Sequence, residues 1–176
     1  MRNLKETEME KVLAKLKIYL GDNVKDLLEE KTLQLNNQRV FLISKKLQKA
    51  CSQIGRKQII SAGTILGKFT KTDNFRITIT SLHKLYKYGI HKVWLTDSAE
   101  NNFLYGNNAL KSHIHKISES IPINAGIFVF NKNNTPLGFG LIAVNQNSYQ
   151  KARGGDIVIL NQSDNGEYIR NEIALA

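Results

Sequence analysis

The chain has 176 residues, of which 41% are hydrophobic and 23% charged, and its formal net charge is +10. This ordinary globular mixture allows one large core or two small ones. No apolar run approaches the roughly 20 residues of a membrane helix. The amino terminus mixes both charge signs, so neither a secretory signal nor a transit peptide is expected. Cys51 is the single cysteine, which rules out an internal disulfide and makes a reducing compartment the default expectation.

The positive charge is concentrated in one segment. Residues 39–92 hold twelve Lys and Arg against one acid, Asp73, whereas residues 1–38 sum to zero and residues 93–176 to −1. A solubilising surface normally interleaves both signs. The local excess therefore favours a polyanionic partner, with nucleic acid ahead of a merely solvated face.

The first predicted element is a helix that begins with a capping box at Thr7 and Glu10 and ends at Gly21. Apolar residues recur along it at helical spacing and predict one core-facing side: Met9, Val12, Leu13, Leu16, Tyr19 and Leu20. Residues 32–43, TLQLNNQRVFLI, then predict strand, turn and strand, with Asn36 and Asn37 in the turn.

A second helix is expected over residues 45–54, with one apolar face made of Leu47, Ala50, Cys51 and Ile54. Cys51 is interpreted as a small core residue on that face and not as a nucleophile, because no partner for catalysis is signalled. GKFTKT (67–72) lacks the second glycine of a phosphate-binding loop, so a strand end and turn with exposed lysines is the simpler interpretation.

Residues 75–80, FRITIT, alternate as a strand does, with Phe75, Ile77 and Ile79 inward and Arg76 outward. A short helix follows, in which Leu82, Leu85 and Tyr86 face inward while Lys84, Lys87 and Tyr88 face outward. The basic residues thus project from regular elements, which favours a patch over a scatter.

The character of the sequence changes near residue 92, where we place the boundary between a first domain, 1–92, and a second, 93–176. HKVWLTD (91–97) is strand-like, and a helix is expected from Ser98 to Tyr105, ended by Gly106. A hairpin around residues 131–134 and a closing strand in GGDIVIL (154–160) complete a pattern of short strands that indicates a small β-barrel.

No motif in the chain signals catalysis. GxGxxG, P-loop, HExxH and paired-cysteine patterns are all absent from the sequence. His113 and His115 would share one face of a strand and supply half of a metal site, but no further ligand is suitably spaced. Contact of their rings with phosphate or base is the favoured alternative. No catalytic residue, metal or cofactor is therefore assigned.

Six short blocks in the same order resemble the Nip-seven family of ribosome biogenesis factors: GKFTKT (67–72), KVWL (92–95), FLYGN (103–107), LKS (110–112), PLGFG (136–140) and GEYIR (166–170). The resemblance covers essentially the whole chain. It implies an α+β protein: an α/β amino-terminal domain with a small antiparallel sheet and flanking helices, then a PUA β-barrel-like domain.

The resemblance further implies a non-catalytic role in pre-rRNA processing for the large, 60S, ribosomal subunit in the nucleolus of the nucleus. The implied partners are pre-rRNA, with U-rich or A/U-rich single strands as candidate tracts, other pre-60S assembly factors and, as further candidates, exosome components. No membrane or small-molecule substrate is implied. Charge and resemblance together give these candidate RNA contacts: Lys68, Lys71, Arg76, Lys84, Lys87, Lys111, His113, His115, Lys116, Lys151 and Arg153.

Two alternatives stay open. PUA modules often accompany pseudouridine synthases and methyltransferases, so the chain could be an RNA-modifying enzyme or its targeting subunit. The first domain lacks a glycine-rich cofactor turn and is short for a catalytic domain of either type, which favours an assembly factor. The other alternative is a protein adaptor whose basic surface meets an acidic partner.

Overall fold

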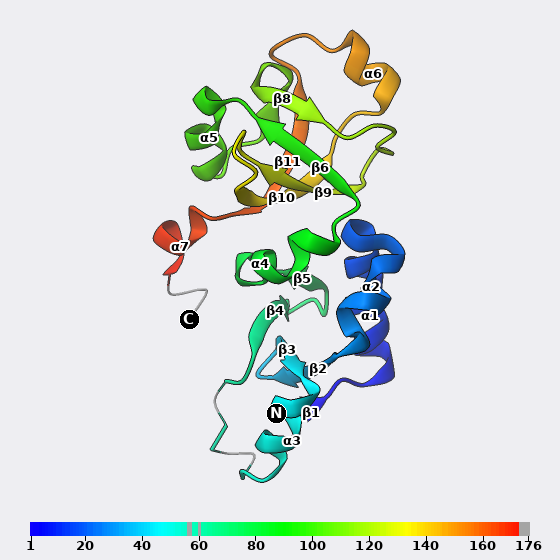
Figure 1. Cartoon of the computed structure of the whole chain (residues 1–176), viewed down its shortest axis with the longest axis vertical. Coiled ribbons are helices and arrows are strands. Elements are labelled where there is room, and N and C mark those ends of the chain that lie inside the picture. The colour runs from blue at the N-terminus through cyan, green and yellow to red at the C-terminus, as the bar shows by residue number, and fades with distance from the viewer. Residues whose placement is uncertain (56–57, 60, 173–176) are drawn as a thin grey trace. The chain divides into compact units, whose positions relative to one another are not determined.

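A computed structural model describes residues 1–55, 58–59 and 61–172 and divides the chain into two compact units, Met1–Tyr88 and Gly89–Ala176 (Figure 1). Each unit has its own sheet and its own core. This architecture confirms the predicted α+β class. Within the described part of the chain, every helix is too short or too polar to cross a bilayer.

The first unit is a five-stranded antiparallel sheet in the order β1-β2-β3-β4-β5, with α1 and α2 packed along it (Figure 1). Its strands are β1 (Arg2–Asn3), β2 (Lys31–Asn36), β3 (Arg39–Ser44), β4 (Thr64–Phe69) and β5 (Phe75–Ile77). Its α-helices are α1 (Glu6–Leu20), α2 (Val24–Glu29), α3 (Lys45–Ser52) and α4 (Leu82–Leu85), with 3-10 turns η1 (Gly21–Asn23), η2 (Ile79–Ser81) and η3 (Tyr86–Tyr88).

Helix α1 begins earlier than the sequence predicts. Its amino-terminal cap is Lys5, whose backbone N–H donates to a Glu8 carboxylate oxygen at 2.8 Å, so the predicted cap at Thr7 and Glu10 is wrong. The predicted apolar face is confirmed at Val12, Leu16, Tyr19 and Leu20, which are fully buried. The helix ends where expected, because Gly21 takes a φ of 54°, a left-handed value that glycine adopts without strain.

The predicted β2–β3 hairpin is confirmed, with its turn one residue later than expected. Asn36 pairs with Arg39, so the two central turn residues are Asn37 and Gln38, at φ values of 46° and 66°. Positive φ at both central residues is typical of the type I′ turn, whose twist matches that of the flanking strands.

Helix α3 differs from its prediction. Ser44 caps it by accepting a hydrogen bond from the Leu47 backbone N–H at 3.2 Å, yet its expected buried face lies open. Leu47 is 39% exposed and Ile54, beyond the end of the helix, is 49% exposed. Cys51 is only half-buried. The periodicity identified the helix correctly, but nothing in a pattern shows whether another element covers the apolar side.

The second unit holds a six-stranded sheet in the order β7-β11-β10-β9-β6-β8, antiparallel except for the parallel pair β6–β9. Its strands are β6 (His91–Leu95), β7 (Ala109–Leu110), β8 (Ile114–Ile117), β9 (Gly126–Phe130), β10 (Pro136–Ile142) and β11 (Ile157–Asp164). Its helices are α5 (Asp97–Leu104), α6 (Gln146–Lys151) and α7 (Glu167–Arg170), with the 3-10 turn η4 (Lys111–His113). Because η4 joins β7 and β8, which end this strand order, the sheet curls into the nearly closed barrel expected of a PUA domain.

The barrel core is apolar and includes Val93, Leu95, Phe103, Val129 and Ile159. The predicted hairpin between β9 and β10 is confirmed. The Asn131 side-chain oxygen accepts hydrogen bonds from the backbone N–H groups of Asn133 and Thr135 at 3.0 and 2.8 Å, which fixes the turn.

Candidate nucleic-acid interface

Five of the candidate RNA contacts lie in the first unit, and two of them are direct neighbours. Lys68 on β4 and Arg76 on β5 face each other across the antiparallel pair, and both side chains are exposed. Phe75 and Ile77, on either side of Arg76, are buried as predicted. The alternation of β5 therefore directs the guanidinium to the surface.

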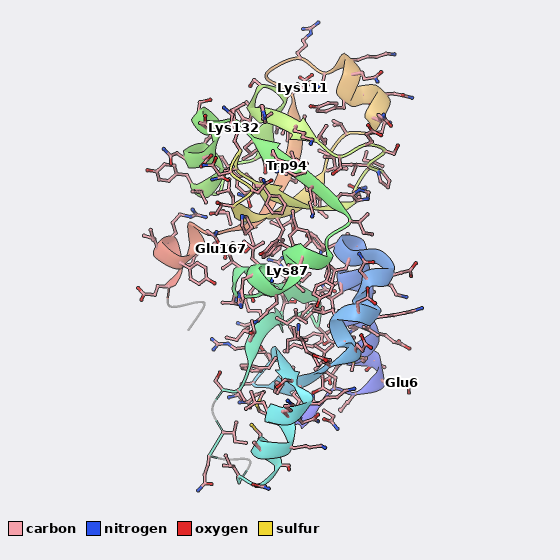
Figure 2. All side chains as sticks on the ribbon, in the orientation of Figure 1. Glu6, Lys87, Trp94, Lys111, Lys132 and Glu167 are labelled. Carbon is pink, nitrogen blue, oxygen red and sulfur yellow. The ribbon has the colours of Figure 1, made fainter. Side chains whose placement is uncertain are left out.

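Lys84 lies on α4 and Lys87 on η3 (Lys87 is labelled in Figure 2), close to a third lysine, Lys31, that sequence reasoning did not name. Burial lowers the pKa of Lys31, and the positive charges of Lys84 and Lys87 lower it further against the opposing effect of Glu30. The Lys31 ammonium lies 5.7 Å from the Tyr88 ring centroid. Three cations on β2, α4 and η3 thus share one neighbourhood, which no local sequence pattern signals because Lys31 lies far from the other two in the chain.

Lys71 is placed differently, in the turn between β4 and β5. It lines an open, mostly polar cavity of about 550 Å³ together with Arg2, Asn37 and Asp73. Asp73 is in turn paired with the Lys11 ammonium. Lys71 is exposed, but a carboxylate lies in its immediate surroundings.

In the second unit, η4 and the loop after α6 bring three cations together. The backbone N–H of Ser112 donates to the Gly154 carbonyl at 3.0 Å, and that of Lys111 donates to the Asp156 carbonyl at 2.9 Å. Lys151 and Arg153, both exposed, therefore lie beside Lys111 (labelled in Figure 2). The Lys111 ammonium is already engaged, at 3.1 Å from the Tyr149 carbonyl oxygen and 3.0 Å from the centroid of the Tyr149 ring.

The two histidines do not share a strand. His113 ends η4, where its Nδ1 accepts a hydrogen bond from the Leu110 backbone N–H at 3.2 Å, and His115 lies exposed on β8. The predicted common face is therefore wrong for His113, whose ring caps its own turn. Among the described residues, no group of three or more His, Cys, Asp or Glu is arranged to hold a metal ion.

Lys116 belongs to a ladder of side chains that crosses β8, β6 and β9. Trp94 pairs with Lys116 on one side and with Phe130 on the other. The Lys116 ammonium is 5.1 Å from the Trp94 ring centroid, and the Trp94 and Phe130 rings stack with centroids 5.8 Å apart. The Trp94 indole N–H donates to the Asn134 side-chain oxygen at 2.7 Å. Sequence reasoning listed Lys116 but not Trp94, whose cross-strand neighbours become visible only with the register.

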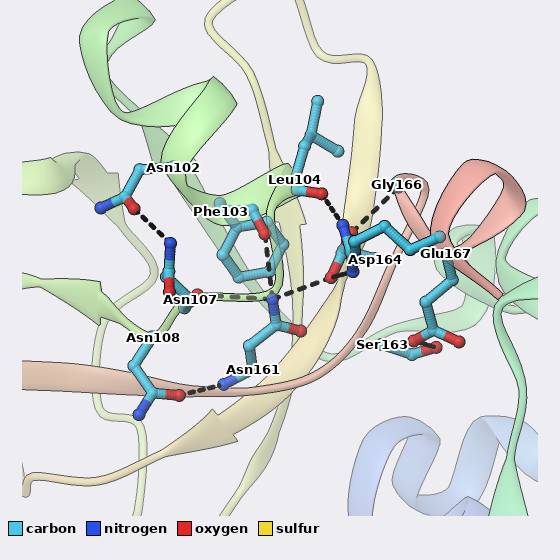
Figure 3. Close-up of polar contacts among 11 residues, drawn as sticks. Asn102, Phe103, Leu104, Asn107, Asn108, Asn161, Ser163, Asp164, Gly166 and Glu167 are labelled. Atoms are coloured by element: carbon cyan, nitrogen blue, oxygen red, sulfur yellow. Dashed lines mark hydrogen bonds and ion pairs between the residues drawn. The ribbon is translucent and has the colours of Figure 1, made fainter.

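Two of the sequence blocks, FLYGN and GEYIR, meet in one polar network (Figure 3). The buried Asp164 carboxylate accepts from Arg170 at 2.9 Å, from the Asn161 side chain at 3.0 Å and from the Gly166 backbone N–H at 2.9 Å. Arg170 also donates to the Leu104 carbonyl oxygen. The network ties the end of α5 to α7, so these blocks have a structural role in holding the barrel together.

The described surface carries ammonium and guanidinium groups, an indole and amide side chains. Such groups can bind phosphates and contact unpaired bases.

Comparison with known proteins gives a consistent result. Residues 1–79 match the family model described as the NIP7/UPF0113 pre-PUA domain, and residues 91–173 match that of the UPF0113 PUA domain. The "60S ribosome subunit biogenesis protein NIP7" of Saccharomyces cerevisiae is 40% identical, and the Xenopus laevis homolog is 39% identical, each alignment covering 99% of both chains.

Solved structures show the same two-part fold. A conserved PUA domain protein from Thermoplasma acidophilum matches with a TM-score of 0.60 at 13% identity, and the alignment covers 99% of each chain. A hypothetical protein from Pyrococcus horikoshii OT3 has a TM-score of 0.60 at 13% identity over 98% of both chains. At such identities the likeness concerns the fold alone.

Proposed function

Since this chain belongs to the NIP7 family, we propose that it is an RNA-binding assembly factor for the large, 60S, ribosomal subunit, required for pre-rRNA processing. The observation that carries this proposal is similarity over nearly the full length to several curated proteins named for 60S ribosome subunit biogenesis. The PUA domain and the exposed cations of both units are consistent with RNA as the ligand.

The finer parts of the proposal are the site of action and the partners. The protein acts in the nucleolus of the nucleus, on pre-rRNA, with U-rich or A/U-rich single strands as candidate tracts. Other pre-60S assembly factors, with exosome components among the candidates, are its protein partners. These parts follow from a role in 60S biogenesis, because large-subunit precursors contain both pre-rRNA and assembly proteins.

The proposed role needs no catalysis by this chain. Support comes from the names of the relatives, which describe biogenesis factors, and from the arrangement of the exposed cations, which suits binding. The alternative of an RNA-modifying enzyme makes a distinct prediction: the purified chain would transfer methyl groups to, or isomerise uridines in, rRNA transcripts. Activity of either kind that a point substitution in this chain removes would replace the proposal.

The proposal is tested by replacing the NIP7 protein of Saccharomyces cerevisiae with this chain. We expect partial or full recovery of the ratio of 60S to 40S subunits in sucrose gradients, and co-sedimentation of the chain with pre-60S particles. Crosslinking followed by sequencing of the bound RNA should recover pre-rRNA of the large subunit. A chain that is folded and expressed, yet restores nothing and crosslinks to no pre-rRNA, would contradict the proposed function.

A further inference from the structure

A row of polar side chains crosses four strands of the first unit. The register pairs Asn36 on β2 with Arg39 on β3, Arg39 with Lys68 on β4, and Lys68 with Arg76 on β5. Direct partners on neighbouring strands point to the same face, and the strands lie about 4.8 Å apart. The three cations therefore stand side by side over roughly 10 Å of the sheet surface.

This arrangement is unfavourable without an anion. Like charges directly opposite each other on neighbouring strands destabilise a sheet, and Lys68 and Arg76 form such a pair. Within the described residues, the side chains of Lys68 and Arg76 form no ion pair with a carboxylate, and both are exposed. The cations of the row thus repel one another in the protein without a bound anion, and they are accessible to a ligand.

A fourth cation extends the row from helix α1. The Lys15 side chain is half-buried, and burial lowers the pKa of its ammonium; the positive charge of Arg76 lowers it further. Helix α1, which carries Lys15, packs against β5, which carries Arg76, so the two charges lie on neighbouring elements. The positive surface therefore continues from the sheet onto the neighbouring helix.

We propose that the row Arg39–Lys68–Arg76, extended by Lys15, binds the phosphate backbone of RNA, as a contact separate from the PUA domain. The inference rests on the proposed function, because RNA is the polyanion that the function supplies. Arginine forks match phosphate oxygens in a bidentate manner and lysine contributes a point charge, so the alternation of the two suits successive phosphates. Base identity plays no part in such a contact.

RNA is favoured over an acidic protein by what surrounds the row. Protein interfaces depend on exposed aromatic or aliphatic anchors that become buried on binding. Among the described residues, the large exposed hydrophobic side chains of the first unit are Ile18, Leu47 and Ile54, none of which lies on β3, β4 or β5. A surface of cations without apolar anchors is typical of a backbone contact.

The test compares two double variants with the same change in charge, each in the full chain. Lys68→Glu with Arg76→Glu reverses the row, and Lys46→Glu with Lys49→Glu reverses two exposed lysines on α3 of the same unit. Each protein is titrated with a uridine-rich single-stranded RNA and with an unrelated single strand of equal length, over a salt series. Thermal unfolding checks each fold, and Lys68→Gln with Arg76→Gln serves if the Glu pair does not fold.

We expect the row variant to lose about tenfold in affinity for both RNAs and about 1.4 in the slope of log K against log salt, which is 0.7 for each of two phosphate contacts on a single strand. The α3 variant should lose distinctly less of both. Equal losses in the two variants overturn the inference. A row variant that binds RNA as the parent does, but no longer binds an acidic protein partner, also overturns it. If the parent chain itself binds no RNA, the proposed function fails first.

Discussion

At the scale of single residues, Glu8 does more than its place in a helical first turn suggests. Its carboxylate accepts hydrogen bonds from Arg2 at 2.6 and 2.8 Å and from the Lys5 backbone N–H at 2.8 Å. The Arg2 guanidinium, helped by the Lys5 N–H, lowers the pKa of Glu8 to about 2 against the opposing effect of burial. One side chain thus joins strand β1 to the start of α1.

Replacing Glu8 with Gln should lower the free energy of unfolding by about 1 kcal/mol at neutral pH, since a helix cap and an ion pair are lost. A carboxyl whose pKa is lowered on folding stabilises the protein above its unfolded pKa, near 4.5, and loses that contribution as the pH falls toward 2. Urea unfolding between pH 7 and pH 2 should therefore show a smaller difference between parent and variant at acid pH. Glu6→Gln, an exposed change in the same turn, is the control and should alter little.

The sequence could not identify this cap because two overlapping patterns compete. Thr7 and Glu10 fit the usual capping box, whereas the pair that forms is Lys5 and Glu8. What decides between them is Arg2 on β1, whose ion pair with Glu8 depends on the sheet being formed. Tertiary contacts of this kind lie outside any local motif.

At the scale of elements, the strands were the most predictable part of the fold. Alternation of apolar residues identified β5 with the correct residues inward, although the strand predicted over residues 75–80 ends at Ile77 and the 3-10 turn η2 follows it. Two apolar runs around an asparagine pair identified the β2–β3 hairpin. Helix α3 was found by its periodicity, but its exposed face was not foreseen because a pattern contains no information about which neighbour packs against it. The register, on which the cation row and the Trp94 ladder depend, came only with the structure.

The β2–β3 turn gives a direct test of backbone strain. Gln38 holds a φ of 66°, which is strained for a residue with a Cβ and unstrained for glycine. Gln38→Gly should therefore raise the free energy of unfolding by about 1 kcal/mol. Gln34→Gly, inside β2 on the same hairpin, should lower it, because glycine weakens a strand interior. Two chemical denaturation curves decide the matter; a destabilised Gln38→Gly would show that this turn is not strained.

Helix α7 offers a second test at the same scale. Asp164 is 1% exposed, so Arg170→Ala leaves a buried carboxylate with only the Asn161 and Gly166 donors. We expect a loss of about 2 kcal/mol in unfolding free energy, the typical value for hydrogen bonds to a charged group. Ile169→Ala, 88% exposed on the same helix, should stay within about 0.5 kcal/mol of the parent. Similar losses in both variants would mean that the ion pair contributes nothing specific.

At the scale of the whole molecule, charge and family point to different halves of the chain. Residues 39–92 carry a net charge of +11, whereas residues 93–176, which hold all but the first two residues of the PUA match at 91–173, carry −1. Net charge can be counted from the sequence, but only the structure shows what each cation contacts. Lys68 lies opposite Arg76, whereas the Lys111 ammonium donates a hydrogen bond to the Tyr149 carbonyl oxygen. Phosphate contacts supply most sequence-independent affinity, and base contacts supply selection. We therefore expect the first unit to dominate affinity and the PUA domain to select bases.

Two triple variants separate these contributions: Lys68, Lys71 and Lys87 to Glu in the first unit, and Lys111, Lys151 and Arg153 to Glu in the second. Each reverses three cations, so the change in net charge is matched. Binding of a single-stranded RNA is titrated over a salt series after the fold of each variant has been checked. The first triple should lose more affinity, and its slope of log K against log salt should fall by about 2, at 0.7 for each phosphate contact.

The second triple should lose less affinity, because Tyr149 already engages the Lys111 ammonium in the free protein. If the second triple abolishes binding while the first leaves it intact, affinity resides in the PUA domain and the charge excess of residues 39–92 serves another partner.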